Sequence, residues 1–143
     1  MALALHAEGL WKLYESGESV IQAVQDVSLT IEPGSMVAIM GPSGCGKTTL
    51  LNVLSGIDEP NSGVVIVNGE NLYASNDDER TRVRGKHMGF IFQEFNLLPV
   101  MTALENVELP LLIQGMSASD ARKEASSAGL RHCTVGEGPL HPA

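Results

Sequence analysis

The strongest constraint on the fold of this chain is a short motif that lies between a predicted strand and a predicted helix. It reads Gly41-Pro42-Ser43-Gly44-Cys45-Gly46-Lys47-Thr48 and fills every fixed position of the pattern G-x-x-x-x-G-K-[ST]. An unbroken apolar run at residues 36–40 precedes it and predicts a strand buried on both faces. Leu50, Leu51 and Leu54 then share one face of a helix predicted over residues 48–55. In this context the pattern acts as a phosphate-binding loop, so we expect an α/β fold.

The glycines and the lysine of the loop suit the binding of a polyphosphate. Gly41, Gly44 and Gly46 allow the backbone to curl so that its N–H groups converge on anionic oxygens. The start of the following helix adds partial positive charge at the same place. Lys47 adds a full charge, which we expect to lie on the β- and γ-phosphates of ATP.

The two threonines extend the same interpretation. The Thr48 hydroxyl is a hard oxygen ligand suited to Mg²⁺, and Thr49 is near enough to reach the α-phosphate. Pro42, Ser43 and Cys45 occupy free positions, where Cys45 is either a tolerated small side chain or a modifiable thiol. The alternative is a glycine-rich turn that binds nothing, but this leaves the match at every fixed position unexplained.

Composition narrows the class of partner. The chain has 143 residues, and 9 Lys and Arg against 17 Asp and Glu give a net charge of −8. So acidic a chain is a poor candidate for binding the phosphate backbone of nucleic acids, and we expect no nucleic-acid partner. The basic residues between 80 and 87 follow acidic ones on one predicted helix, which favours a solvated surface matched to the helix dipole.

Compartment and membrane signals are weak. Cys45 and Cys133 make no disulfide framework, which favours a reducing cytoplasm. The N-terminus lacks the charged and apolar regions of a signal peptide. The longest apolar runs, at residues 36–40 and 109–113, are far shorter than the ~20 residues of a spanning helix. Work at a membrane would therefore require another chain to cross it.

Local patterns predict the remaining elements. Strands are expected over residues 3–13, 27–31, 64–67 and 89–92, with a turn at Asn68-Gly69. Helices are expected to begin after Asn76, Thr102 and Ser117, each followed three residues later by an acidic residue. We expect the first helix of the chain to end at Gly56, the helix after Thr102 to break at Pro110, and the last to end near Ala128.

Four segments together resemble one protein family. They are WKLYESGE, VSLTIEPGSMVAIMGPSGCGKTTLLNVLSGIDEPNSG, VVIVNGENL and GKHMGFIFQEFNLLPVMTALENV. From about Ala4 to Glu124 the chain resembles the N-terminal half of an ABC transporter ATPase, closest to the lipoprotein-release and macrolide-export group of bacterial transporters. The implied fold is a truncated P-loop NTPase of ABC type, with an N-terminal antiparallel β subdomain and the start of a helical subdomain.

The resemblance also implies site residues outside the loop. Tyr14 matches the aromatic residue that stacks on adenine, although a buried tyrosine at a strand end is the competing interpretation. Gln93 matches the Q-loop glutamine, which binds Mg²⁺ or its water and senses a membrane subunit; otherwise it is an exposed loop residue. Lys47 and Gln93 would then be catalytic, and Thr48 and Gln93 would bind the metal.

The family implies partners as well. A helical subdomain is expected from about residue 94, and its first apolar residues either contact a membrane-spanning transporter subunit or pack the subdomain itself: Phe95, Leu97, Leu98, Pro99 and Met101. The intact parent would form a homodimer or pair with a second ATPase subunit. It would lie in the cytoplasm, peripheral to the inner face of the bacterial plasma membrane, and use ATP and Mg²⁺.

The chain also departs from the family pattern. It contains no LSGGQ signature, no Asp-Glu pair after an apolar strand beyond Gln93, and no switch histidine that can be placed. We therefore expect residues 1–125 to be part of an ABC ATPase domain, residues 126–143 to be an anomalous tail, and the sheet centre to lack strands. The alternative is a non-catalytic remnant that binds nucleotide weakly or not at all. A P-loop kinase or GTPase is a third possibility, but no base-specific N-K-x-D loop is present.

Overall fold

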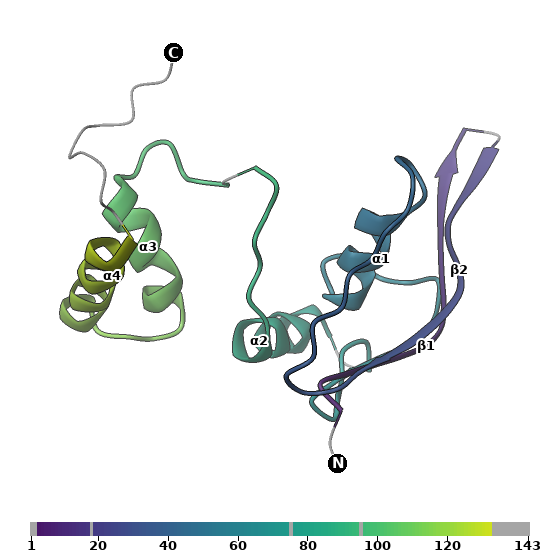
Figure 1. Cartoon of the computed structure of the whole chain (residues 1–143), viewed down its shortest axis with the longest axis horizontal. Coiled ribbons are helices and arrows are strands. Elements are labelled where there is room, and N and C mark those ends of the chain that lie inside the picture. The colour runs from purple at the N-terminus through teal and green to yellow at the C-terminus, as the bar shows by residue number, and fades with distance from the viewer. Residues whose placement is uncertain (1–2, 18, 75, 95, 133–143) are drawn as a thin grey trace. The chain divides into compact units, whose positions relative to one another are not determined.

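Two antiparallel strands build most of the first unit of the chain. The computed structural model describes residues 3–17, 19–74, 76–94 and 96–132, and it divides into one unit at Met1–Gly89 and another at Phe90–Ala143. Strand β1 (Leu5–Ser16) pairs with β2 (Ser19–Ile31) along almost its whole length. Figure 1 shows the two as a long curved ribbon. The strands predicted over residues 3–13 and 27–31 are therefore confirmed.

Irregular pairing shapes this ribbon. The register shifts three times between Ala7 and Leu13, which marks β-bulges. Gly9 and Asp26 have positive φ values of 58° and 47° in this region. Such bulges increase local twist and curve the ribbon, which explains why the apolar spacing in β1 is irregular.

Two shorter strands complete the sheet, whose order is β2-β1-β3-β4. Strand β3 (Ser62–Val67) pairs antiparallel with β1 and with β4 (Glu70–Asn71). Asn68 and Gly69 connect them with φ values of 48° and 86°, as the Asn-Gly signal predicts for a tight hairpin.

Helices α1 and α2 pack on this sheet. Helix α1 (Lys47–Leu54) buries Val53 and Leu54. Gly56 follows its C-terminus with a φ of 74°, which confirms the predicted stop. Helix α2 (Asp77–His87) buries Val83, and its N-cap Asn76 accepts a hydrogen bond from the backbone N–H of Glu79. One cluster of buried residues joins the sheet and both helices: Ala7, Leu10, Val24, Val53, Leu54, Val65, Val67, Leu72 and Val83.

The second unit contains helices α3 (Ala103–Ile113) and α4 (Ala118–His132), which lie side by side (Figure 1). Thr102 and Glu105 form the predicted capping box, and Ser117 caps α4 through Asp120. The predicted break at Pro110 is wrong. The helix continues because Gln114 still donates its N–H to the Pro110 carbonyl, and only the N–H that proline lacks is lost.

The end of α4 also differs from the prediction. The helix runs to His132, four residues beyond the end expected near Ala128. Ala121 and Ala125 are buried one helical turn apart, so contact with α3 supports a helix that has only a weak apolar pattern. The predicted tail boundary at residue 125 falls inside α4 and stays a prediction, and Cys133 with the rest of residues 133–143 lies outside the described residues.

Two predicted strands do not form. Residues 36–40 and 89–92 have neither helical nor strand structure, and Met36 and Ile91 are fully exposed. A buried parallel strand depends on hydrogen bonds from neighbours on both sides. Within the described ranges no other strand lies beside these segments, so their apolar side chains remain exposed, as expected for a sheet that lacks central strands.

In the part of the chain that is described, no helix has both the length and the apolar character needed to cross a bilayer.

Candidate functional site

The phosphate loop and strand β2 enclose a hollow of about 900 Å³ in the first unit. Two groups of residues line it. One is the loop with the first turn of α1, from Ser43 to Leu50. The other is apolar or uncharged and comes from β1, β2 and the segment before the loop: Tyr14, Ile21, Gln22, Ala23, Val24, Gln25, Val27, Ile39 and Met40. A volume of this size suits a small-molecule ligand.

Two of the three glycines of the phosphate loop adopt a left-handed backbone conformation. Gly44 and Gly46 have φ values of 79° and 87°, in the left-handed region that L side chains rarely adopt. Gly46 is also the N-cap of α1, so the helix begins at Lys47. The first N–H groups of a helix have no partner within the helix, and here they lie next to the loop. The hollow therefore lies at a positive helix terminus.

Lys47 lies back over its own loop. Its ammonium group donates to the backbone oxygens of Gly41, at 2.9 Å, and Pro42, at 2.6 Å. The Cys45 Sγ lies 3.6 Å from the same nitrogen, and its thiol is free and exposed. Backbone carbonyl groups therefore solvate the Lys47 ammonium group, and the loop contains no carboxylate to pair with it.

The charge of the lining is unusual for so acidic a chain. Among the described residues that line the hollow, Lys47 is the one charged side chain, and no aspartate or glutamate is present. The whole chain carries a net charge of −8. A site with one cation, a helix N-terminus and no carboxylate selects an anionic ligand.

Tyr14 lies on β1 and lines the same hollow, so the structure brings it together with the loop. Its hydroxyl donates a hydrogen bond of 2.6 Å to Oδ2 of Asp58, and this bond is the main reason that the pKa of Tyr14 is raised. The ammonium nitrogen of Lys12 lies over the ring, 4.9 Å from its centroid. Tyr14 is 37% exposed, which excludes the buried strand-end tyrosine considered above.

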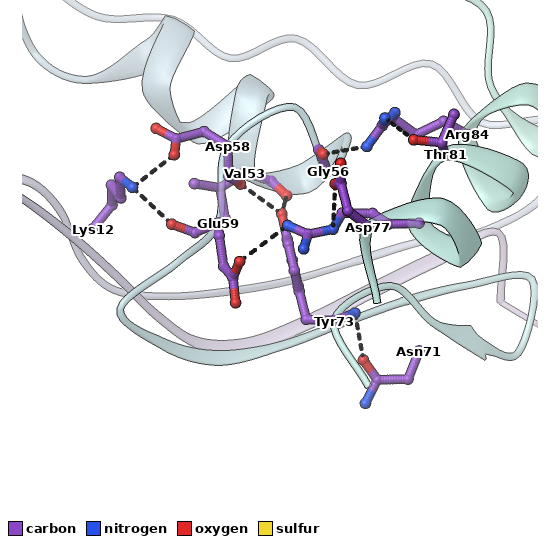
Figure 2. Close-up of polar contacts among 11 residues, drawn as sticks. Lys12, Val53, Gly56, Asp58, Glu59, Asn71, Tyr73, Asp77, Thr81 and Arg84 are labelled. Atoms are coloured by element: carbon purple, nitrogen blue, oxygen red, sulfur yellow. Dashed lines mark hydrogen bonds and ion pairs between the residues drawn. The ribbon is translucent and has the colours of Figure 1, made fainter. Parts of the chain in front are cut away.

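Asp58 and Lys12 were not predicted from the sequence. Figure 2 shows Lys12 between the side chain of Asp58 and the backbone of Glu59, with its ammonium nitrogen 2.7 Å from an oxygen of each. Burial raises the pKa of the Asp58 carboxyl, but the hydrogen bonds from Lys12 and Tyr14 outweigh burial, so the pKa is lowered overall. The two residues are separated by 46 positions, and no local pattern links them.

The turn that carries Asp58 is fixed from the opposite side. The Tyr73 hydroxyl lies within hydrogen-bond distance of the backbone oxygens of Val53 and Asp58, and Arg84 donates to the backbone oxygen of Gly56 (Figure 2). Burial raises the pKa of Tyr73, so it remains a neutral donor. The backbone of the turn that carries Asp58 is thereby held by side chains from outside the turn.

Thr48 and Thr49 belong to the first turn of α1 and both line the hollow. Thr48 is exposed there, so its hydroxyl can reach a ligand. Within the described ranges no group of three or more His, Cys, Asp or Glu side chains could hold a metal ion. A Mg²⁺ ion at this site would thus depend on the phosphates of the ligand with Thr48, which fits the usual preference of Mg²⁺ for substrate phosphate oxygens.

Gln93 belongs to the second unit and is exposed. Its role as a metal ligand stays a prediction. Leu97, Leu98 and Pro99 are exposed, and Met101 is half-buried, while Phe95 lies outside the described residues. These exposed side chains therefore do not pack a core within the described unit.

Comparison with known proteins gives the family. Residues 24–139 match the ABC transporter family. The chain is 46% identical over 121 residues to an uncharacterized ABC transporter ATP-binding protein, MJ1508, of Methanocaldococcus jannaschii, covering 85% of this chain and 54% of that protein. It is 44% identical over 126 residues to a macrolide export ATP-binding/permease protein, MacB 1, of Yersinia pestis, covering 88% of this chain and 19% of the relative.

Solved structures agree. The dimeric ABC transporter cassette MJ0796 superposes with a TM-score of 0.81 at 43% identity, covering 86% of this chain and 54% of that one. A second dimeric structure of MJ0796, bound to ADP and Pi, gives a TM-score of 0.80 at the same identity. The chain spans about half the length of MJ1508 and of the solved MJ0796 chain. On the phosphate loop, the fold and these matches, the chain belongs to the ABC transporter ATP-binding family.

Proposed function

We propose that this chain binds ATP with Mg²⁺ in the hollow between the phosphate loop and β2. The observation that carries the proposal is the charge of the lining: one cation, Lys47, at a helix N-terminus, with no carboxylate among the lining residues that the structure describes. A triphosphate supplies the anion that this arrangement selects. The relative MJ0796 has been solved with ADP and Pi, which supports a nucleotide as the ligand.

The two parts of the hollow suit the two parts of ATP. Lys47 and the N–H groups at the start of α1 suit the β- and γ-phosphates, and the Thr48 hydroxyl suits the Mg²⁺ between them. Tyr14 and the apolar residues of β2, among them Ile21 and Val24, suit the flat apolar face of adenine. We therefore assign adenine to the Tyr14 end and the phosphates to the loop end.

The family suggests the larger context. We propose that the intact protein couples ATP binding and hydrolysis to transport through a membrane-spanning partner, on the cytoplasmic face of the plasma membrane. The names of the relatives as ATP-binding and permease proteins support the partner, and the dimeric structures of MJ0796 support a second ATPase subunit. Gln93 and the exposed Leu97 and Leu98 are the candidate contacts with that partner.

A second candidate is a chain that binds nucleotide without hydrolysing it. Its support is that, among the 143 residues, no Asp-Glu pair follows an apolar strand after Gln93. Both candidates share the same nucleotide site, so binding is tested first and turnover separately.

Thermal unfolding tests the binding site. Mg-ATP should raise the melting temperature, because a ligand present at a hundredfold over its Kd adds ~2.7 kcal/mol to the free energy of unfolding. Lys47→Ala should abolish the shift. Lys86→Ala is the matched control, because it removes a surface lysine of α2 that pairs with Glu70 of β4. This variant should retain the shift in melting temperature. A wild-type chain that melts cooperatively with no shift at millimolar Mg-ATP would overturn the proposal.

A further inference from the structure

We propose that Asp58 is a positioning residue, which acts with Lys12 to hold the Tyr14 ring ready for the base of the nucleotide. The inference rests on the proposed function, since it requires a base to bind at Tyr14. It adds two residues to the site that do not themselves line the hollow.

Two contacts hold the ring from different directions. The hydroxyl is bound to Oδ2 of Asp58 at 2.6 Å, which fixes the far end of the side chain. The Lys12 ammonium group lies over the ring at 4.9 Å from the centroid, which restrains its rotation. Lys12 is itself bound to Oδ1 of Asp58 at 2.7 Å, so one carboxylate organises both contacts.

The same geometry leaves one ring face available. A cation over one face of an aromatic ring excludes a base from that face, and Tyr14 still lines the hollow. Stacking therefore has one approach, on the face opposite Lys12. An exposed tyrosine without these contacts would lose the freedom of two side-chain torsions each time a base bound. Because Asp58 and Lys12 already restrict those torsions, that cost is reduced.

Further contacts hold the turn behind Asp58. Its backbone oxygen accepts from the Tyr73 hydroxyl at 2.7 Å, and the neighbouring Glu59 side chain pairs with Arg80 at 3.2 Å. Lys12 is 13% exposed and Asp58 is 29% exposed, so water competes only partly for their contact. The Lys12–Asp58 pair thus joins β1 to the turn after α1 next to Tyr14.

A purely structural strut between β1 and this turn is the competing explanation. It predicts that breaking the pair lowers stability and weakens every ligand of the site alike. The positioning role instead predicts a selective loss, because inorganic tripolyphosphate engages the loop but has no base to stack. The ratio of the Kd for Mg-tripolyphosphate to the Kd for Mg-ATP therefore separates the two explanations.

The experiment measures both dissociation constants by calorimetry for wild type, Asp58→Ala, Lys12→Met and Tyr14→Phe. Each variant should lose affinity for Mg-ATP by roughly two- to tenfold, about the value of one hydrogen bond. Affinity for Mg-tripolyphosphate should stay within about twofold of the wild-type value, because this ligand has no base to stack on Tyr14. Tyr14→Phe keeps the Lys12–Asp58 pair and removes one hydroxyl, so it tests the idea even if Asp58→Ala fails to fold.

Control variants separate a failure of the positioning role from a failure of the proposed function. Arg82→Ala breaks a more exposed ion pair, with Glu70 at 3.1 Å, and should change neither constant. In an Asp58→Ala background, Tyr14→Phe should cause no further loss. Equal weakening of both ligands, or an unchanged ratio in all three variants, overturns the positioning role. A wild-type chain that binds neither ligand overturns the proposed function and this inference with it.

Discussion

Gly46 and the backbone of Ala23 are in such close contact that a Cβ atom on Gly46 would lie 2.1 Å from the Ala23 carbonyl oxygen. This contact joins the start of α1 to β2 and closes one side of the hollow. Gly44, two residues earlier in the same loop, has open space around its missing side chain. The loop therefore contains two glycines with similar φ values but different surroundings.

This pair gives a matched stability test. Gly44→Ala should cost about 1–2 kcal/mol, because its φ is unfavourable for an L residue. Gly46→Ala should cost more, since overlap with a backbone atom adds a further ~1–3 kcal/mol. Urea denaturation followed by circular dichroism measures both. Equal losses would show that α1 can move away from β2 freely.

A second prediction concerns the adenine end of the site. Tyr14→Ala should weaken Mg-ATP binding by ~1–3 kcal/mol, the usual value of stacking between a base and an aromatic ring. Stacking alone predicts little effect of Tyr14→Phe, because the aromatic ring is kept. The bond to Asp58 changes this expectation to a measurable loss that is smaller than that of Tyr14→Ala. Calorimetric titration of the two variants ranks them, and equal losses would contradict a stacking role for the ring.

A third prediction concerns acid stability. Arg82, Lys86 and His87 of α2 surround the Glu70 carboxylate of β4, and their hydrogen bonds, with that from Lys86 the largest, lower its pKa to about 2. Because the folded-state pKa lies below the unfolded value, the stabilisation is complete above pH ~4.5 and is lost as the pH falls through about 2. Glu70→Gln should thus lower the melting temperature at pH 6 and make a smaller difference as the pH falls toward 2.

The comparison requires a control carboxylate. Glu15 is exposed at the end of β1, and Glu15→Gln should leave the melting temperature at pH 6 close to that of wild type. Melting curves from pH 2 to pH 7 for the three proteins test the prediction. A Glu70→Gln difference that is constant over this whole range would show that the ion pairs contribute nothing to the pH dependence.

A fourth prediction is that the 143-residue chain alone hydrolyses ATP at no more than a trace rate. General-base catalysis typically contributes ~10²–10⁴-fold and requires a base within about 3 Å of the attacking water. Six acidic residues follow Gln93 in the sequence: Glu94, Glu105, Glu108, Asp120, Glu124 and Glu137. Glu105 is bound in a helix cap, Glu108 pairs with Arg122, Asp120 bonds to Ser117, and Glu137 lies outside the described residues.

Release of inorganic phosphate from purified chain measures this turnover, with Lys47→Ala as the reference for contaminating activity. The expected result is the same low rate for both proteins. Robust turnover that depends on Lys47 would contradict the prediction and would mean that one of these carboxylates reaches the water.

Local signals predicted much of the fold. The Asn68-Gly69 turn, the Asn76 and Thr102 caps and the stop at Gly56 each depend on a few adjacent residues, and each is confirmed. Their geometry is set by backbone freedom and by short side chains that bind neighbouring N–H groups. Such features form in the same way whatever surrounds them.

Features that depend on distant partners were predicted poorly. Residues 36–40 and 89–92 have the composition of buried strands, but a strand exists only if a neighbour supplies its hydrogen bonds. Helix α3 passes through Pro110, because loss of one N–H weakens a helix without always ending it. These errors come from treating a nonlocal property as a local one.

The candidate site also combines a local feature that the sequence predicts with a nonlocal one that it does not. The phosphate loop is a contiguous motif, and its left-handed glycines and the position of Lys47 at the start of α1 follow from that motif. The contact between Tyr14 and Asp58 joins residues 44 positions apart, and either residue alone is unremarkable. Only the antiparallel pairing that places β1 beside the turn after α1 brings them together.

The bonds of Lys47 to Gly41 and Pro42 have a consequence for affinity. An arriving phosphate does not meet an unoccupied cation; it must displace two carbonyl groups that already solvate the ammonium ion. The dissociation constant of the nucleotide therefore reports the replacement of the backbone oxygens around the Lys47 ammonium group by phosphate oxygens. Internal competition of this kind makes the site selective, because a weak anion gains too little to displace the backbone oxygens, whereas a polyphosphate with several charged oxygens gains enough.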